Sequence, residues 1–114
     1  MDVHSPCLER TDLGIAGFEW DEGNRDKCRK HGVSIVAVES LFHRPFAVFP
    51  DPAHSGIEER FKAIGWTDDE RAVLIVFTLR KKEDGTFVRP ISARYMHRKE
   101  VEHYEKEVTK AGKR

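Results

Sequence analysis

The segment 72–95, AVLIVFTLRKKEDGTFVRPISARY, contains the pattern that decides the fold. Its first eight residues, 72–79, are almost entirely apolar and rich in β-branched side chains, as expected of a central strand that is covered on both faces. Asp84-Gly85 is a strong hairpin signal, after which residues 87–95 return as a second strand. Pro90 requires a bulge or an outward-facing position in that strand. The segment therefore predicts a β-hairpin that includes the central strand of a sheet.

Capping signals upstream of the hairpin delimit two helices. Asp21 is a good N-cap, and Gly32 is the residue type that most easily takes the left-handed conformation after a helix, so a first helix is predicted between them. Ser34 caps a second helix, which Pro45 ends.

The remaining elements are short strands near residues 15–20, 46–49 and 60–66, and a closing helix over about 97–110. Two helices followed by hairpin-joined strands indicate an α+β domain. We expect two N-terminal helices and a C-terminal helix packed on a twisted antiparallel sheet of about four strands. Residues 17–110 are predicted to form this single domain, with an N-terminal extension, 1–16, and a C-terminal tail, 111–114.

The composition is that of a globular domain, with 39% hydrophobic and 35% charged residues in a chain of 114. The sequence contains no apolar run of about 18 residues and no signal-peptide pattern, so a membrane span is not expected. Cys7 and Cys28 form neither a disulfide framework nor a CxxC pair, and Cys28 is expected to be a core contact of the first helix. A reducing cytoplasm is the expected location.

The formal net charge of zero conceals an asymmetry along the chain. Residues 1–70 contain 14 Asp and Glu against 8 Lys and Arg, whereas residues 71–114 contain 6 against 12. The C-terminal part can therefore form a cationic face that meets phosphate or an acidic partner. The alternative is that the two parts neutralise each other across the folded domain.

The six histidines show none of the close spacings of metal ligands, such as i and i+4, and neither cysteine lies in a CxxC. We therefore expect surface or loop histidines and no metal or other cofactor. The sequence also lacks the GxSxG nucleophile motif and the phosphate-binding GxxxxGK[ST] loop.

Arginines at the ends of the predicted strands remain as candidates for chemistry: Arg60, Arg80, Arg89 and Arg94. If Asp84-Gly85 is a two-residue turn, Arg80 lies directly opposite Arg89. Like charges in that position destabilise a sheet unless a carboxylate or a bound anion lies between them. The alternative is that these arginines are ordinary rim residues bonded to nearby glutamates or loop carbonyls.

Four stretches resemble the BrnT family of type II toxin–antitoxin toxins: GFEWDEGNRDKCRKHGVS (17–34), EERFKAIG (58–65), RPISARYM (89–96) and KEVEHYE (99–105). KHGVS and ISAR together make the resemblance specific. It implies a RelE-like fold and a metal-independent ribonuclease that cleaves RNA and arrests translation. It also implies a BrnA-like antitoxin with a ribbon-helix-helix DNA-binding segment, and it allows a homodimer within the complex. Many family members carry an arginine and an alanine after SAR, where this chain has a tyrosine and a methionine.

Metal-free cleavage requires that the RNA 2′-hydroxyl loses a proton, that the phosphorane is stabilised and that the leaving 5′-oxygen gains a proton. Guanidinium groups suit the phosphate because they bind it bidentately and remain charged. With the resemblance, Arg60, Arg80 and Arg94 are expected to form a phosphate clamp, with Arg89 as a weaker member.

His31 is the acid or base candidate within the matched N-terminal motif, since an unperturbed histidine has a pKa of about 6.5. Lys30 is expected to contact the RNA backbone, and Glu59 to orient Arg60 or to act as a base. For His31 the alternative is a plain cation at a helix end. For the whole chain the alternative is a non-catalytic module that binds an antitoxin or nucleic acid, which the zero net charge supports.

Overall fold

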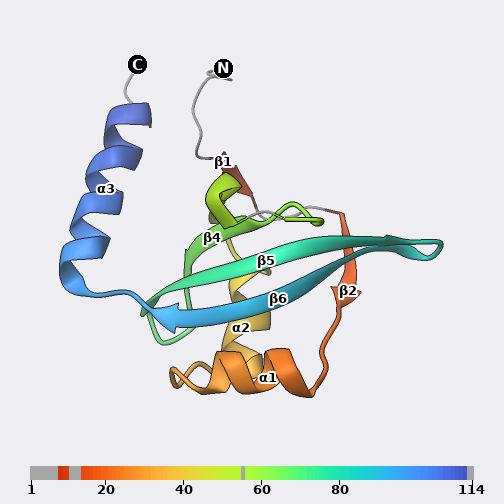
Figure 1. Cartoon of the computed structure of the whole chain (residues 1–114). Helices are drawn as coiled ribbons and strands as arrows, with labels where there is room; N and C mark the ends of the chain where they lie inside the picture. The colour runs from red at the N-terminus through yellow and green to blue at the C-terminus, as the bar shows by residue number, and fades with distance from the viewer. Residues whose placement is uncertain (1–7, 11–13, 55, 113–114) are drawn as a thin grey trace.

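Within residues 8–10, 14–54 and 56–112, which the computed structural model describes, the chain forms a six-stranded sheet and three α-helices (Figure 1). The elements are β1 (Leu8–Arg10), β2 (Ile15–Phe18), α1 (Glu22–Arg29), α2 (Ile35–Leu41), β3 (Phe46–Pro50), a short 3-10 helix η1 (Pro52–His54), β4 (Phe61–Trp66), β5 (Ala72–Lys82), β6 (Gly85–Tyr95) and α3 (Arg98–Gly112). The strands lie in the order β1-β3-β4-β5-β6-β2.

The predicted α+β class is confirmed, because two helices precede an antiparallel meander, β3 to β6, and a third helix follows it. The predicted strand number and the all-antiparallel sheet are wrong. β1 pairs antiparallel with β3, and β2 pairs parallel with β6, so each edge of the meander gains a strand. A three-residue strand is too short to show an alternating pattern, and a parallel partner far along the chain leaves no turn signal.

The N-terminal segment therefore contributes to the sheet before the predicted domain start at residue 17. β1 and the first two residues of β2 fall within the predicted extension, 1–16. The remainder of that extension, except Gly14, lies outside the described residues. At the other end α3 continues to Gly112, and residues 113–114 of the predicted tail are also outside the described residues.

The start of α1 is fixed by a capping box that also ties the helix to the sheet. Asp21 Oδ1 accepts the Asn24 N–H at 3.0 Å, and Asn24 Oδ1 accepts the Asp21 N–H at 2.7 Å. The Asn24 Nδ2 group donates to the carbonyls of Glu19 and Pro90 at 3.0 and 2.8 Å. Asn24 is buried, and it joins the end of β2, α1 and β6 at one point.

The end of α1 confirms the predicted role of Gly32, whose φ is +82°. The Val33 N–H bonds to the Cys28 carbonyl and the Gly32 N–H bonds to the Arg29 carbonyl. This is the hydrogen-bond pattern of a Schellman motif, in which a glycine reverses the chain and an apolar residue follows it. Cys28 and Val33 are both fully buried, so the helix end is also part of the core.

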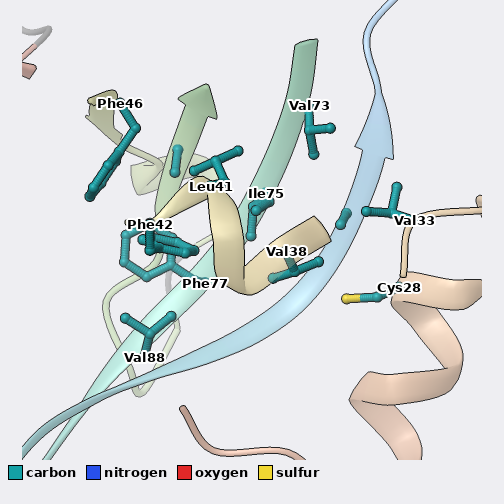
Figure 2. Close-up of a cluster of buried hydrophobic side chains, with 12 residues drawn as sticks. Cys28, Val33, Val38, Leu41, Phe42, Phe46, Val73, Ile75, Phe77 and Val88 are labelled. Atoms are coloured by element: carbon teal, nitrogen blue, oxygen red, sulfur yellow. The ribbon is translucent and has the colours of Figure 1, made fainter. Parts of the chain in front are cut away.

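α1 and α2 cover one face of the sheet, and their apolar side chains form the core with that face (Figure 2). The core residues are Cys28, Val33, Val38, Leu41, Phe42, Phe46, Ala63, Val73, Ile75, Phe77, Val88 and Ala93. Because side chains alternate along a strand, their neighbours lie on the opposite face. We call this opposite face the open face, defined by Ile64, Leu74, Thr78, Arg89 and Arg94.

The turn of the β5–β6 hairpin is formed by Glu83 and Asp84, one residue earlier than predicted, because Lys82 pairs with Gly85. Gly85 belongs to β6 with a φ of +134°. A Cβ atom at this position would lie 2.6 Å from the Cβ of Ala16 in β2. The glycine therefore serves the close packing of β2 against the start of β6.

This shift of the turn changes every cross-strand partner, and the predicted opposition of Arg80 and Arg89 is wrong. Arg80 lies opposite Phe87, and Arg89 lies opposite Thr78. The two arginines are diagonal neighbours on one face of the sheet, still close enough for long side chains to interact. Of the two alternatives predicted for Pro90, a bulge or an outward-facing position, the structure has the bulge, since the pairing register shifts beside this residue and Pro90 is buried.

Gly65 of β4 makes room for α2 on the covered face. A Cβ atom at Gly65 would lie 2.8 Å from Leu41 Cγ and 3.2 Å from both of its methyl carbons. Leu41 is fully buried, so its branched end cannot move away without disturbing the core.

We expect Gly65→Ala to lower the free energy of unfolding by about 1–3 kcal/mol, because the added methyl overpacks the core. The matched control is Gly56→Ala, where a Cβ atom meets nothing within 4 Å and the change should stay within about 0.5 kcal/mol. Urea unfolding followed by circular dichroism measures both. Equal stability of the two variants would contradict this account of the α2 contact.

Candidate functional site

Arg60, Thr78 and Arg89 form a row across the open face. Arg89 lies opposite Thr78 in the β5–β6 pairing. On the other side of β5, Phe61 pairs with Phe77, so Arg60, which precedes β4, follows in register beside Thr78. Since neighbouring strands are about 4.8 Å apart, the two arginine backbones are roughly 10 Å apart. Two guanidinium groups at this separation can approach one phosphate from opposite sides.

The hydroxyl in the middle of this row is an unusual feature. Thr78 is 1% exposed, and its Oγ1 has no hydrogen-bond partner among the described residues. Buried polar groups are normally paired, and an unpaired one costs about 1–3 kcal/mol. The row therefore contains a hydroxyl with unused hydrogen-bonding capacity between two cations.

Arg60 and Arg89 line one open cleft of about 550 Å³ at the N-terminus of α1, and Lys27 of α1 also lines it. The other lining residues are Asp21, Glu22, Gly23, Asn24 and Ile91. Three cations and two anions give this cleft a net positive lining. The N-terminal end of the α1 dipole adds a positive field, so the cleft suits an anionic group.

Glu19, one residue after β2, is the common acceptor for three cations beside the row. Its Oε1 lies 3.2 Å from Arg80 Nη1 and 3.5 Å from Arg89 Nη1, and its Oε2 lies 2.8 Å from Lys82 Nζ. The hydrogen bond with Lys82 and the charges of the three cations lower the pKa of Glu19, although desolvation opposes the shift. A carboxylate thus separates the two arginines, as their shared face requires.

Arg80 is held from its other side by Glu58 in the segment before β4. Arg80 Nε lies 2.6 Å from Glu58 Oε2, and Nη2 donates to Oε1 at 3.2 Å. The guanidinium is thus shared by Glu19 and Glu58 and has a fixed orientation. Arg80 therefore connects three segments and supports the row, whereas Arg89 and Arg60 line the cleft.

Asp21 connects the row to α1. Its Oδ2 accepts a hydrogen bond from Arg89 Nη2 at 2.7 Å, while its Oδ1 caps the helix. The backbone hydrogen bond from Asn24 and the bond from Arg89 both lower the pKa of Asp21. The carboxylate occupies the position at the helix N-terminus where anions bind well, and it orients Arg89.

Arg94 lies outside this row, although it shares the open face. It pairs with Leu74, four residues along β5 from Thr78, which is about 13 Å. Its guanidinium forms a bidentate pair with Glu100 of α3 at 2.8 and 2.7 Å. This pairing raises the pKa of Arg94 and lowers that of Glu100 to about 2. The structure does not bring Arg94 to the other predicted arginines.

His31 and Lys30 do not line the cleft. Both are exposed beyond the C-terminal end of α1, about one helical turn after Lys27, the last residue of that helix to line it. Glu59 is exposed and directly precedes Arg60. Of the other predicted site residues, His31, Lys30 and Glu59, only Glu59 is adjacent in the sequence to a member of the row.

Sequence reasoning missed Glu19, Lys27 and Thr78 as parts of this site and treated Asp21 only as a helix cap. One signal pointed to such residues, because like charges on one face of a sheet require a carboxylate between them. This signal could not identify Glu19, since the parallel pairing of β2 with β6 determines which carboxylate lies beside Arg80 and Arg89. Thr78 gave no signal, because it lies within the apolar stretch 72–79.

Other chemistry has less support in the described part of the chain. No group of three or more His, Cys, Asp or Glu side chains is placed there to hold a metal ion, and no helix is long and apolar enough to cross a membrane. Cys28 is buried, as predicted, and burial raises the pKa of its thiol to about 11. It is therefore not an activated nucleophile.

Comparison with protein families identifies the region that contains the site. The family model of the ribonuclease toxin BrnT, of type II toxin–antitoxin systems, matches residues 20–100, well over half of the chain, from just before α1 to the start of α3. The matched region includes the row and the cleft. A search of curated proteins found no match.

We expect Glu19→Gln to lower the free energy of unfolding by about 1–2 kcal/mol at pH 7, because three cations lose their shared counter-charge. The pKa of Glu19 is depressed in the folded state, so its contribution is present above about pH 4.5 and disappears as the pH falls through the folded-state pKa. The unfolding free energies of wild type and variant should therefore differ less at pH 3 than at pH 7, which urea unfolding of both proteins at the two pH values measures.

The matched control is Glu22→Gln, an exposed carboxylate in the first turn of α1. Its effect should stay within about 0.5 kcal/mol. If the two variants lose the same stability at pH 7, Glu19 is not the common acceptor that organises the row.

Proposed function

This chain belongs to the BrnT family of ribonuclease toxins of type II toxin–antitoxin systems, and on that premise we propose that it cleaves RNA at the cleft beside α1. The observation that supports this location most directly is that Arg60, just before β4, and Arg89 of β6 line the same open cleft together with Lys27. Guanidinium groups bind phosphate bidentately and stay charged at every physiological pH.

The proposed reaction is metal-independent. The 2′-hydroxyl gives its proton to a carboxylate base and attacks the adjacent phosphorus. The bond to the 5′-oxygen breaks as that oxygen takes up a proton, which leaves a 2′,3′-cyclic phosphate and a 5′-hydroxyl. Arg60 and Arg89 bind the non-bridging oxygens and stabilise the extra negative charge of the phosphorane, a role in which one donor contributes about 10²–10³ in rate. Lys27 supplies a further hydrogen-bond donor at the cleft.

Proton transfer is assigned to the carboxylates at the cleft. Asp21 lines it and Glu59 directly precedes Arg60, whereas His31 lies at the other end of α1. A phosphate that binds Arg89 weakens the bond between Arg89 and Asp21. Because that bond is one of those that lower the pKa of Asp21, its loss makes the carboxylate a better base as the RNA arrives.

In the cell this activity would arrest translation by destroying RNA in the cytoplasm. The partner we propose is an antitoxin of BrnA type, whose ribbon-helix-helix segment binds DNA, and the neutralised complex would contain a dimer of the toxin. These points rest on the family rather than on any geometry of this chain.

A non-catalytic binding module is the second candidate, and one observation favours it. Arg80 is already paired with two carboxylates, and Arg89 is bonded to Asp21. A cluster neutralised in this way could bind an antitoxin or nucleic acid without turnover. This candidate predicts salt-sensitive RNA binding with no more than one product molecule per protein molecule.

We expect Arg89→Ala and Arg60→Ala each to slow cleavage of a fluorescent RNA in EDTA by at least about 100-fold, because each removes a donor to the phosphorane. Arg89→Lys should retain part of the activity, since lysine keeps the positive charge but lacks the planar guanidinium group that binds phosphate bidentately. His31→Ala is the matched control, with a rate within about twofold of wild type. Circular dichroism and thermal unfolding check that each variant is folded.

A ribonuclease with another site would give a different pattern. If His31→Ala abolishes cleavage while Arg60→Ala and Arg89→Ala do not, catalysis belongs to the C-terminal end of α1. If folded wild-type protein shows no multiple turnover in EDTA, the binding module becomes the better description.

A further inference from the structure

A second cleft, of about 670 Å³, lies between α3 and the open face of the sheet. Its floor includes Ile64 of β4, Leu74 of β5 and Met96 after β6, all half-buried. Phe49 of β3 and Tyr104 of α3 meet edge to face, with ring centroids 6.3 Å apart. We call this cleft the α3 groove. Figure 1 shows α3 at the end of the sheet, standing away from α1 and α2.

We propose that the α3 groove is the docking site for an amphipathic helix of the antitoxin. The apolar stripe of that helix would lie on Ile64, Leu74 and Met96, and its acidic side chains would face Lys62 and Lys99. This inference rests on the proposed function in one respect, since it takes a protein antitoxin as the partner of this toxin.

The partner segment should be helical because the floor of the groove offers no backbone hydrogen bonds. β4 and β5 are interior strands with neighbours on both sides, so their main-chain groups are used within the sheet. An extended peptide laid on this face would leave its own N–H and C=O groups unpaired. A helix satisfies them internally and presents an apolar stripe, as in other helix-in-groove complexes.

The charges at the groove indicate an acidic partner. Lys62, Lys99 and His103 line the groove, while Arg94 and Glu100, which also line it, neutralise each other. If a second copy of this chain docked through the same groove by twofold symmetry, the cations of one copy would face the same cations of the other and repel them. A different chain with carboxylates beside its apolar stripe is complementary.

The same features separate this groove from the cleft beside α1. The floor is aliphatic, and the two aromatic residues at the groove, Phe49 and Tyr104, pack edge to face against each other and do not form a row of flat platforms on which nucleic-acid bases stack. The arginine at this site is held by a carboxylate in a bidentate pair. A closed apolar cavity of about 150 Å³ accommodates one benzene ring, so the groove has room for several apolar side chains.

The test measures the affinity of the purified antitoxin, encoded at the same toxin–antitoxin locus, for variants of the full chain by calorimetry. Leu74→Glu should raise Kd by at least about 30-fold, as expected for loss of an interface anchor. The double variant Lys62→Glu, Lys99→Glu should raise Kd by about tenfold and reduce its salt dependence. Val36→Glu, at a 75% exposed apolar residue of α2, is the matched control and should stay within about twofold.

RNA cleavage by the same proteins, without antitoxin, separates this inference from the proposed function. The groove variants should cut RNA within about twofold of wild type and resist neutralisation by the antitoxin. The proposal is overturned if both groove variants bind the antitoxin with wild-type affinity. If Leu74→Glu fails to fold, the double variant Lys62→Glu, Lys99→Glu alone decides. Loss of RNA binding with unchanged antitoxin affinity would assign the groove to RNA, and dissociation of a toxin dimer would assign it to a second copy. Absence of cleavage in wild type would remove the nuclease proposal but leave the binding result intact.

Discussion

The parallel pairing of β2 with β6 is the constraint on which the site depends. It places the chain that leaves β2 beside β6, so that Glu19 and Asp21 arrive next to Arg80 and Arg89. Without these carboxylates, diagonal arginines on one sheet face would repel each other. The pairing also brings Asn24 to the Pro90 carbonyl, which fixes the N-terminus of α1 at the edge of the cleft.

The open face has two ends with different chemistry. At one end Arg60, Thr78 and Arg89 lie in a row beside a polar cleft, and at the other α3 stands over an apolar floor. Along β5 the change occurs between Thr78 and Leu74, four residues apart. A sheet face that α3 covers at one end only can therefore offer separate sites for a phosphodiester and for a protein partner.

Local signals were sufficient for the helices and for the covered face of the sheet. Asp21 and Gly32 delimit α1 through hydrogen bonds that span only a few residues, so their patterns are legible in the sequence. The site depends on the pairing register of strands that are far apart in the sequence, and an error of one residue in that register changes which side chains meet. Moving the turn by one residue changes the partner of Arg80 from Arg89 to Phe87, and nothing local indicates which carboxylate β2 delivers.

The paired state of the arginines reconciles the zero net charge with a site for RNA. Each carboxylate that holds Arg80 or Arg89 lowers the affinity of the cluster for phosphate, because the RNA must compete for the same N–H groups. The same carboxylates hold the guanidinium groups in position before the RNA binds, and preorganised donors contribute most to a charged transition state. In the proposed reaction, a phosphate bound beside Arg89 would weaken its bond to Asp21, and binding of the substrate itself would then raise the basicity of that carboxylate.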